Sequence, residues 1–264
     1  YRPDIDGLRA VAVLSVVFFH AFPAYLTGGF VGVDIFFVIS GYLIYSIIHQ
    51  NLRDGQFSIA LFYQRRIRRI FPALLTVVGL SLAAGYYLML PDEMQALGKH
   101  SLGAATFLSN FVLWNESGYF DADIYLKPLM HLWSLAVEEQ FYLVVPLLLG
   151  LTWKRIPTWA LMGVLVLASL AYSVYATGHN ASAAFFSPLS RFWEIGAGCL
   201  AGFVMSHAPA RSGWSGFVQA SPKLIAAGNA LAAAALVWSC VWVTDKMPFP
   251  GWTALPAIAA TVFL

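Results

Sequence analysis

Long apolar runs separated by short polar stretches recur along the whole chain. A bilayer core roughly 30 Å thick needs about 20 apolar residues for each helical span. The runs therefore predict about eight membrane-spanning helices. Their expected ranges are 10–26, 30–49, 70–90, 132–153, 158–177, 185–206, 224–243 and a last run that starts at Trp252.

A further segment, 96–114, gives a weaker signal because Lys99 and His100 lie in its first turn. It can cross the membrane, re-enter it or lie flat on its surface. The predicted fold is an all-α, polytopic transmembrane helix bundle of about eight to nine spans. We expect one domain over residues 1–264.

The composition fits this pattern. Of the 264 residues, 59% are hydrophobic and only 11% are charged, whereas a soluble domain carries about a quarter charged residues. A soluble globular protein is therefore excluded, and a net charge of +2 gives no indication of nucleic-acid binding. The two cysteines, Cys199 and Cys240, lie in apolar runs without metal-ligand spacing, so we predict no metal site.

Basic residues predict the orientation, because they are enriched in cytoplasmic loops. The strongest cluster lies in the loop expected between the second and third spans and comprises Arg65, Arg66, Arg68 and Arg69. Arg2 and Arg9 then place the amino terminus in the cytoplasm as well. If 96–114 does not cross, which we prefer, the acidic stretch 119–125 is external. The internal side then also holds Lys154, Arg155, Arg211 and Lys223.

His20 is a polar side chain at membrane depth. It follows Arg9 by eleven residues, or about 16 Å of helix rise, and so lies near the middle of the bilayer. Ionisable groups at this depth are costly and usually functional. The alternative is a histidine that only forms a hydrogen bond to a neighbouring helix, and we favour the functional interpretation.

Glu138 and Glu139 lie about 11 Å into their predicted span. Adjacent helix positions point about 100° apart, so at most one of the two acids is expected to pair with His20. The alternative is a structural acid with a local partner. The partners available for that role are Trp133, Tyr142 and Arg191.

The remaining intramembrane charges have structural interpretations. Arg191 and Glu194 are three residues apart and are expected to neutralise each other on one helix face. Asp34 lies one turn inside its span, where backbone donors of that turn are expected to satisfy it. Arg66 and Arg69 share a helix face, which suits either bidentate phosphate binding or a simple orientation signal.

Several segments together resemble the acyltransferase-3 family of bacterial membrane enzymes. They occur in the expected order and cover essentially the whole chain. The segments are YRPDIDGLRAVAVLSVVFFHAF, GGFVGVDIFFVISGYLI, RRIRRIFPALL, HLWSLAVEEQFYLVVP and RFWEIGAGCLAG.

The resemblance implies site residues. The family pattern of a basic residue, ten others and a histidine matches Arg9 and His20. Its paired arginines are similar to Arg66 and Arg69. Its acid in the EEQF motif matches Glu138, with the acid after it as the weaker match.

The resemblance also implies an activity. Members use an acyl-CoA donor from the cytoplasm to modify lipopolysaccharide O-antigen, peptidoglycan, exopolysaccharides or other glycans. For this chain we expect acetyl-CoA as the donor and a hydroxyl of a cell-envelope glycan such as O-antigen as the acceptor. We therefore expect a multi-pass protein of the bacterial inner membrane with a glycan acceptor that is either free or lipid-linked. The opening YRPDIDGLRA is similar to members fused to an extracytoplasmic SGNH-type domain. That domain and the closing helices are expected to be absent from residues 1–264.

Acyl transfer to a hydroxyl needs a base, and His20 is the candidate, with Glu138 as its orienting acceptor. Arg66 and Arg69 would hold coenzyme A phosphates while the pantetheine arm passes Arg9. Direct transfer and a covalent acyl-histidine relay both fit this arrangement.

Two other functions remain open. One is a proton-coupled transporter of a glycan or small solute, with His20, Glu138 and Glu194 as a proton relay. The other is a non-catalytic scaffold of a glycan-assembly complex.

Overall fold

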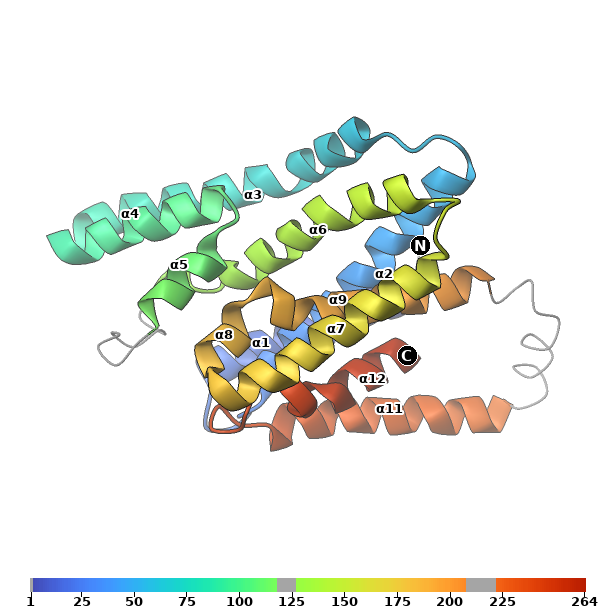
Figure 1. Ribbon diagram of the computed structural model, residues 1–264. Helices are drawn as coiled ribbons and strands as arrows, with labels where there is room; N and C mark the ends of the chain where they lie inside the picture. The colour runs from blue at the N-terminus through green and yellow to red at the C-terminus, as the bar shows by residue number, and fades with distance from the viewer. Residues whose placement is uncertain (1, 118–126, 208–221) are drawn as a thin grey trace. The chain divides into compact units, whose positions relative to one another are not determined.

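The computed structural model describes residues 2–117, 127–207 and 222–264, and all regular structure in these ranges is helical (Figure 1). The predicted all-α class is therefore confirmed. The stretch 119–125 and Arg211, both used above for orientation, lie outside the described residues. The α-helices are α1 (Pro3–Ala21), α2 (Gly32–Arg53), α3 (Ile59–Leu88), α4 (Pro91–Ala105), α5 (Ser109–Glu116), α6 (Leu132–Thr152), α7 (Thr158–His179), α8 (Ala181–Phe186), α9 (Pro188–His207), α11 (Pro222–Trp242) and α12 (Leu255–Phe263).

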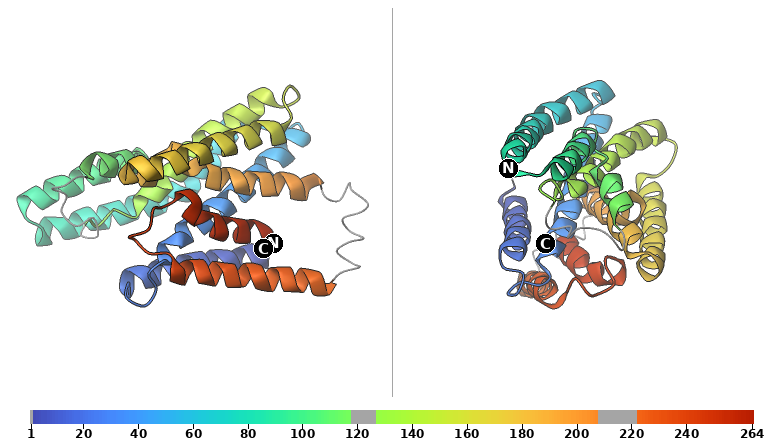
Figure 2. Two further views of the ribbon diagram at one scale, coloured as in Figure 1. Left: turned by 60° about the horizontal axis from the view of Figure 1, so that its bottom comes forward. Right: turned by 90° about the vertical axis from the view of Figure 1, so that its left-hand side faces the viewer.

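The helices form two compact units. The first unit has a core of apolar side chains from α1, α2, α9, α11 and α12, and α12 lies alongside α11 in both views of Figure 2. The second has a core from α3, α4 and α6. The first unit comprises Tyr1–Gln50, Thr152–Phe185 and Leu189–Leu264, and the second comprises Asn51–Leu151 and Phe186–Pro188.

Five helical segments in the described part of the chain are long and apolar enough to cross a membrane. The predicted span at 10–26 is helical as far as Ala21, where α1 ends, and α1 begins with the charged residues Asp4, Asp6 and Arg9. The predicted span at 185–206 lies mostly in α9, which carries Arg191 and Glu194. The apolar helical run at Gly251–Phe263 is short. The count of eight to nine spans is therefore not confirmed. The five segments are Gly29–Arg53, Ile59–Leu88, Leu132–Thr152, Thr158–His179 and Pro222–Trp242.

The third predicted span begins earlier than expected. Helix α3 starts at Ile59 rather than at residue 70, and the Ser58 hydroxyl caps it by accepting a hydrogen bond from the Leu61 amide at 3.3 Å. All four arginines of the cluster lie inside α3, so the connection between the second and third predicted spans is helical at these positions, as the shared helix face of Arg66 and Arg69 requires. Arginine is a strong helix former, and an N-cap stabilises the extra turns.

The segment 96–114 is not one helix. Helix α4 ends at Ala105, Phe107 adopts a left-handed φ of 54°, and α5 begins at Ser109. The 15 residues of α4 rise about 22 Å, less than the thickness of a bilayer core. Neither helix is among the five that are long and apolar enough to cross.

Glu116, at the end of α5, ties this helix back to α4. Its carboxylate accepts hydrogen bonds from Lys99 at 2.7 Å, Lys127 at 3.0 Å and the His100 Nε2–H at 2.7 Å. Burial acts to raise the pKa of Glu116, but the hydrogen bonds from these three side chains outweigh it and lower the pKa to about 2. Lys99 and His100, which weakened the predicted span at 96–114, thus connect α4 to α5 in a helical hairpin.

Glycines bring α2 and α9 into close contact. A Cβ atom on Gly198 would collide with the Val38 carbonyl oxygen, and one on Gly41 would collide with the Ile195 carbonyl oxygen. Small residues of this kind allow helix backbones to approach in membranes. The close contact also brings together charged side chains of the two helices, which are Asp34 of α2 and Arg191 and Glu194 of α9.

We expect Gly198→Ala to lower the thermal unfolding midpoint. Its new Cβ would force α2 away from α9, and overpacking of this kind typically costs about 1–3 kcal/mol. Gly163→Ala is the matched control, because a Cβ on Gly163 of α7 would have nothing within 4 Å. In the control, the higher helix propensity of alanine should leave the midpoint unchanged or raised. Equal midpoints for the two variants in one detergent would contradict the close contact.

Candidate functional site

Arg66 of α3 is the centre of a charged cluster in the second unit. Its guanidinium lies 2.6 Å from Glu139 Oε1 and 3.8 Å from Glu138 Oε1, both on α6. It also lies over the Tyr142 ring at 3.8 Å from the ring centre, and the Tyr142 hydroxyl donates to Glu138 at 2.7 Å. The arginine is therefore held by two carboxylates and one aromatic ring.

This geometry refines the predicted roles. Glu139, the weaker match to the family acid, makes the short ion pair with Arg66, and Glu138 is bonded to Tyr142 as its structural interpretation anticipated. Arg66 is not available as an unpaired clamp for phosphate. Arg69 is exposed, so of the two arginines it is the one placed to meet a soluble anion.

A small pocket of about 260 Å³ opens beside this cluster. Arg66 and Glu139 form part of its wall. Most of the remaining wall is apolar or aromatic and comes from α3, α6 and the turn between α4 and α5. These further lining residues are Tyr63, Ile67, Ile70, Phe71, Phe107, Tyr142 and Leu143.

Polar residues that the sequence analysis did not single out support the pocket. The Gln140 amide donates to the Phe107 carbonyl oxygen at 2.7 Å and to Asn110 Oδ1 at 2.8 Å. Asn110 is fully buried and donates to the Phe186 carbonyl oxygen at 3.0 Å. An asparagine and a glutamine within apolar helices were the signal that could have identified this network.

His20 lies in the last turn of α1, in the first unit. Its Nδ1 atom is 2.8 Å from the Val16 carbonyl oxygen. A carbonyl oxygen only accepts, so in the neutral ring Nδ1 carries the proton and Nε2 carries the lone pair. Glu138 is therefore not required to fix the tautomer, because an acceptor within α1 already does so.

The predicted pairing of His20 with Glu138 stays a prediction, because the two residues belong to different units. The same holds for Arg9, whose guanidinium is 3.5 Å from Asp6 in the first turns of α1. The structure brings Arg66 together with Glu138 and Glu139. It joins Asp34, Arg191 and Glu194 in a second cluster.

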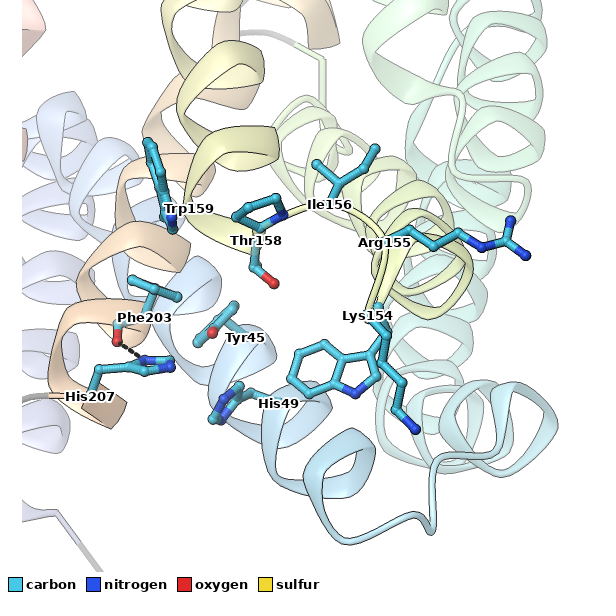
Figure 3. Close-up of a pocket in the computed structure, with 11 residues that line it drawn as sticks. Tyr45, His49, Lys154, Arg155, Ile156, Thr158, Trp159, Phe203 and His207 are labelled. Carbon is cyan, nitrogen blue, oxygen red and sulfur yellow. Dashed lines mark hydrogen bonds between the residues drawn. The ribbon is translucent and has the colours of Figure 1, made fainter. Parts of the chain in front are cut away.

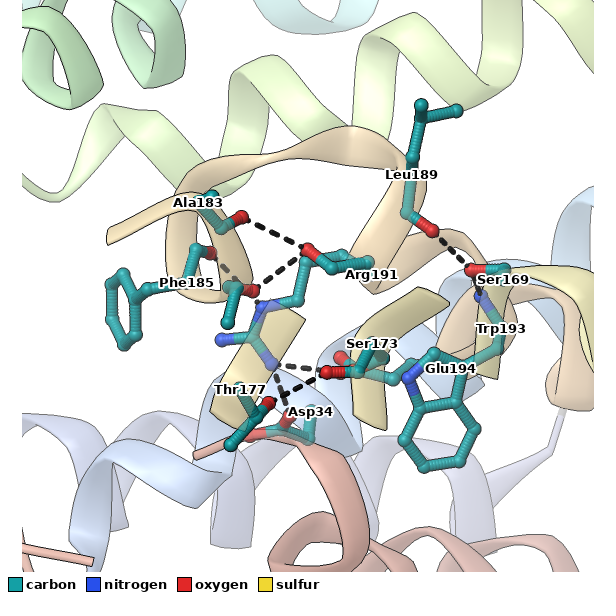
Figure 4. Close-up of polar contacts among 12 residues, drawn as sticks. Asp34, Ser169, Ser173, Thr177, Ala183, Phe185, Leu189, Arg191, Trp193 and Glu194 are labelled. Carbon is teal, nitrogen blue, oxygen red and sulfur yellow. Dashed lines mark hydrogen bonds and ion pairs between the residues drawn. The ribbon is translucent and has the colours of Figure 1, made fainter. Parts of the chain in front are cut away.

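That second cluster joins α2 and α9 through one guanidinium (Figure 4). Arg191 Nη1 donates to Glu194 Oε1 at 2.7 Å and to Asp34 Oδ1 at 2.8 Å, and its Nε–H donates to the Phe185 carbonyl oxygen at 3.2 Å. The exposed fractions are 0% for Asp34, 1% for Arg191 and 0% for Glu194. The predicted Arg191–Glu194 neutralisation is confirmed, whereas the partnership of Asp34 with Arg191 was not foreseen.

Aromatic rings enclose this cluster. The Arg191 guanidinium carbon is 5.2 Å from the ring centres of Phe185 and Phe249 and 6.0 Å from that of Phe37. The arginine is already bonded to both carboxylates, and apolar rings surround it, so the network suits the fixing of helix positions better than the binding of a ligand. We therefore assign the cluster a structural role, holding α2 against α9.

Among the described residues, no group of three or more histidine, cysteine, aspartate or glutamate side chains is arranged to hold a metal ion.

Comparison with known proteins assigns the family. The acyltransferase-3 profile, described as an acyltransferase domain, matches residues 2–264. The chain belongs to the acyltransferase-3 family. The resemblance carried by the five sequence segments is thus confirmed, and this acyltransferase-3 domain spans the full set of helices described above.

Three relatives of this acyltransferase-3 chain illustrate its similarity. It is 33% identical over 211 residues to the O-acetyltransferase OatA of Staphylococcus aureus, covering 77% of this chain and 35% of that protein. It is 36% identical over 213 residues to the peptidoglycan O-acetyltransferase OatA of Listeria monocytogenes, covering 77% and 34%. It is 37% identical over 202 residues to the putative membrane-bound transacylase BcsY of Komagataeibacter xylinus, covering 75% and 50%.

The chain thus spans about a third to a half of the length of these relatives. No solved structure matches it.

Proposed function

We propose that this protein is a membrane-bound O-acyltransferase, which moves an acetyl or other acyl group from acyl-CoA to a hydroxyl of a cell-envelope glycan. The observation that carries the proposal is the geometry of His20. Its Nδ1 donates to the Val16 carbonyl oxygen at 2.8 Å, which leaves the Nε2 lone pair as a base. Family membership supports the same reaction class.

The reaction needs one proton acceptor. The acceptor hydroxyl oxygen attacks the thioester carbonyl carbon while its proton moves to His20 Nε2. The carbon–sulfur bond then breaks, and the imidazolium returns the proton to the departing thiolate. A covalent relay would instead use the same lone pair as the nucleophile. Nε2 would bond to the carbonyl carbon while the carbon–sulfur bond breaks and coenzyme A leaves as the thiol, and the acceptor hydroxyl would then attack the acyl-histidine, break its carbon–nitrogen bond and lose its proton to the released imidazole.

The donor is proposed to be held through its phosphates by Arg9, Arg66 and Arg69. Arg69 supports this role best, because it is exposed on α3. Arg66 would act from its ion pair with Glu139, and the 260 Å³ pocket beside it has apolar walls suited to a short acyl chain or to part of the pantetheine arm.

The proposed setting is the bacterial inner membrane, with the amino terminus in the cytoplasm and about eight to nine spans. Lipopolysaccharide O-antigen and peptidoglycan are the two acceptor classes to compare. Peptidoglycan has the additional support that one relative is named a peptidoglycan O-acetyltransferase. The first experiment is therefore turnover of acetyl-CoA by the purified full-length protein in lipid, with either glycan as the acceptor.

Arg69→Ala is expected to weaken acetyl-CoA binding about tenfold, because it removes charge-assisted hydrogen bonds to phosphate. Calorimetry in lipid nanodiscs measures the dissociation constant. Arg68→Ala is the matched control, since Arg68 is also exposed and is the preceding residue of α3. Equal losses in both variants would indicate general electrostatic attraction, and no loss in Arg69→Ala would remove Arg69 from the donor site.

The transporter alternative makes a different prediction. It requires solute uptake that is independent of acyl-CoA, with protons passing between Glu194 and the other ionisable groups. Glu194 is held by Arg191 at 2.7 Å in a buried network, which suits a fixed structural charge better than a relay. Uptake without acyl-CoA, together with no turnover on either glycan, would favour the transporter.

A further inference from the structure

A second and larger pocket, of about 510 Å³, lies in the first unit (Figure 3). It is formed by the carboxyl-terminal ends of α2 and α9 and by the turn that leads into α7. Neither the predicted site residues nor the family segments include the side chains that give it its character. These are His49, Trp153, Lys154, Arg155, Trp159 and His207.

The pocket is basic without any acidic counterpart. Lys154, Arg155 and two histidines line it, and none of its described lining residues is a carboxylate. Lys154 and Arg155 form no ion pair within the described part of the chain, and Arg155 extends away from the group of residues in Figure 3. This contrasts with Arg66, which two carboxylates already hold. The pocket therefore attracts an anion.

Aromatic rings make up much of the wall. His49 stacks on Tyr45 with ring centres 5.4 Å apart, and it meets the Trp153 ring edge-on at 5.5 Å. Trp159 also lines the pocket and has an exposed fraction of 58%. An exposed indole beside a cationic group can stack on a planar base while the cation meets a phosphate.

Two local features indicate that the pocket is built for a ligand. Lys154 adopts a left-handed φ of 76°, a conformation that a lysine adopts only at a cost and that is often found at functional sites. Tyr45, which is 1% exposed, lies in the middle of the group in Figure 3, and its buried hydroxyl has no hydrogen-bond partner among the described residues. A ligand hydroxyl or phosphate oxygen would satisfy it.

We propose that this pocket binds a nucleotide, with the phosphates at Lys154 and the histidines and the base against Trp159. A volume of about 510 Å³ lies within the range of small-molecule sites. In the predicted orientation this end of α2 faces the cytoplasm, where nucleotides are abundant. None of the residues that line this pocket is one of the three arginines proposed above for the acyl-CoA donor, so this nucleotide site does not depend on the proposed function.

Binding of ADP and of pyrophosphate to the full-length protein in phosphatidylcholine nanodiscs tests the two halves of the pocket separately. Lys154→Gly removes the charge and suits the left-handed backbone, so it should weaken both ligands about tenfold without loss of stability. Trp159→Ala should weaken ADP about tenfold and leave pyrophosphate unchanged. Lys223→Ala, at an exposed lysine of α11, is the charge-matched control and should change neither.

Three results would overturn the proposal. They are no ADP binding by the wild type, unchanged ADP binding in Lys154→Gly, and loss of ADP binding when the nanodiscs contain phosphatidylglycerol. The last result would assign the pocket to an anionic lipid headgroup.

Discussion

Replacement of His20 by glutamine is expected to reduce acyl transfer by at least about a hundredfold, the lower end of what a general base contributes. Glutamine keeps an amide donor that can reach the Val16 carbonyl oxygen, but it offers no lone pair that binds a proton at neutral pH. Binding of acetyl-CoA and the thermal unfolding midpoint should stay at wild-type values. Transfer of labelled acetyl groups to the glycan acceptor measures the effect.

His179→Gln is a closely matched control for this experiment. The Nδ1 atom of His179 lies 2.8 Å from the Tyr175 carbonyl oxygen in the last turn of α7, the same local geometry as that of His20 in α1. Loss of transfer in His20→Gln but not in His179→Gln would support a specific role for His20. Full activity of His20→Gln would exclude the base.

Replacement of Arg191 by methionine is expected to have the largest effect on stability. It would leave Asp34 and Glu194 as two buried carboxylates without the cation that bridges them at 2.8 and 2.7 Å. Removal of one partner from a buried ion pair typically costs about 3–5 kcal/mol. Thermal unfolding in detergent should show a large drop in the midpoint, together with a low yield of folded protein.

Two further variants test the cause of that loss. Arg68→Met removes an exposed arginine from α3 and should have little effect on stability. Addition of Asp34→Asn and Glu194→Gln to Arg191→Met removes the uncompensated charges and should recover part of the stability. An Arg191→Met protein as stable as the wild type would show that the network does not hold α2 against α9.

The helices were predictable because their cause is local. Apolar runs of membrane-spanning length must satisfy their backbone groups internally, and α-helices do this within one segment. The helix ends were less predictable, as α3 shows, since its first turns are polar and depend on the Ser58 cap and on the helix propensity of the arginines. The break at Phe107 in the 96–114 segment likewise depends on contacts made by Glu116 and Gln140.

The candidate site was predictable in its residue types but only partly in its contacts. Charges inside apolar runs identified His20, Arg191 and the two glutamates of α6, because such groups are rare in membranes. The spacing of three residues was enough to predict the Arg191–Glu194 pair, since both lie on one turn of α9.

The sequence by itself determined the membrane character, the helical class, the family and the set of intramembrane polar residues, because each follows from local composition or from a linear motif. The tertiary structure decided which charges meet. It paired Arg66 with Glu139 and Arg191 with Asp34, 73 and 157 positions apart in the chain, and it assembled the pocket around Lys154 from three separate segments. Contacts between distant segments depend on how helix surfaces pack, and no local pattern in the chain encodes that packing.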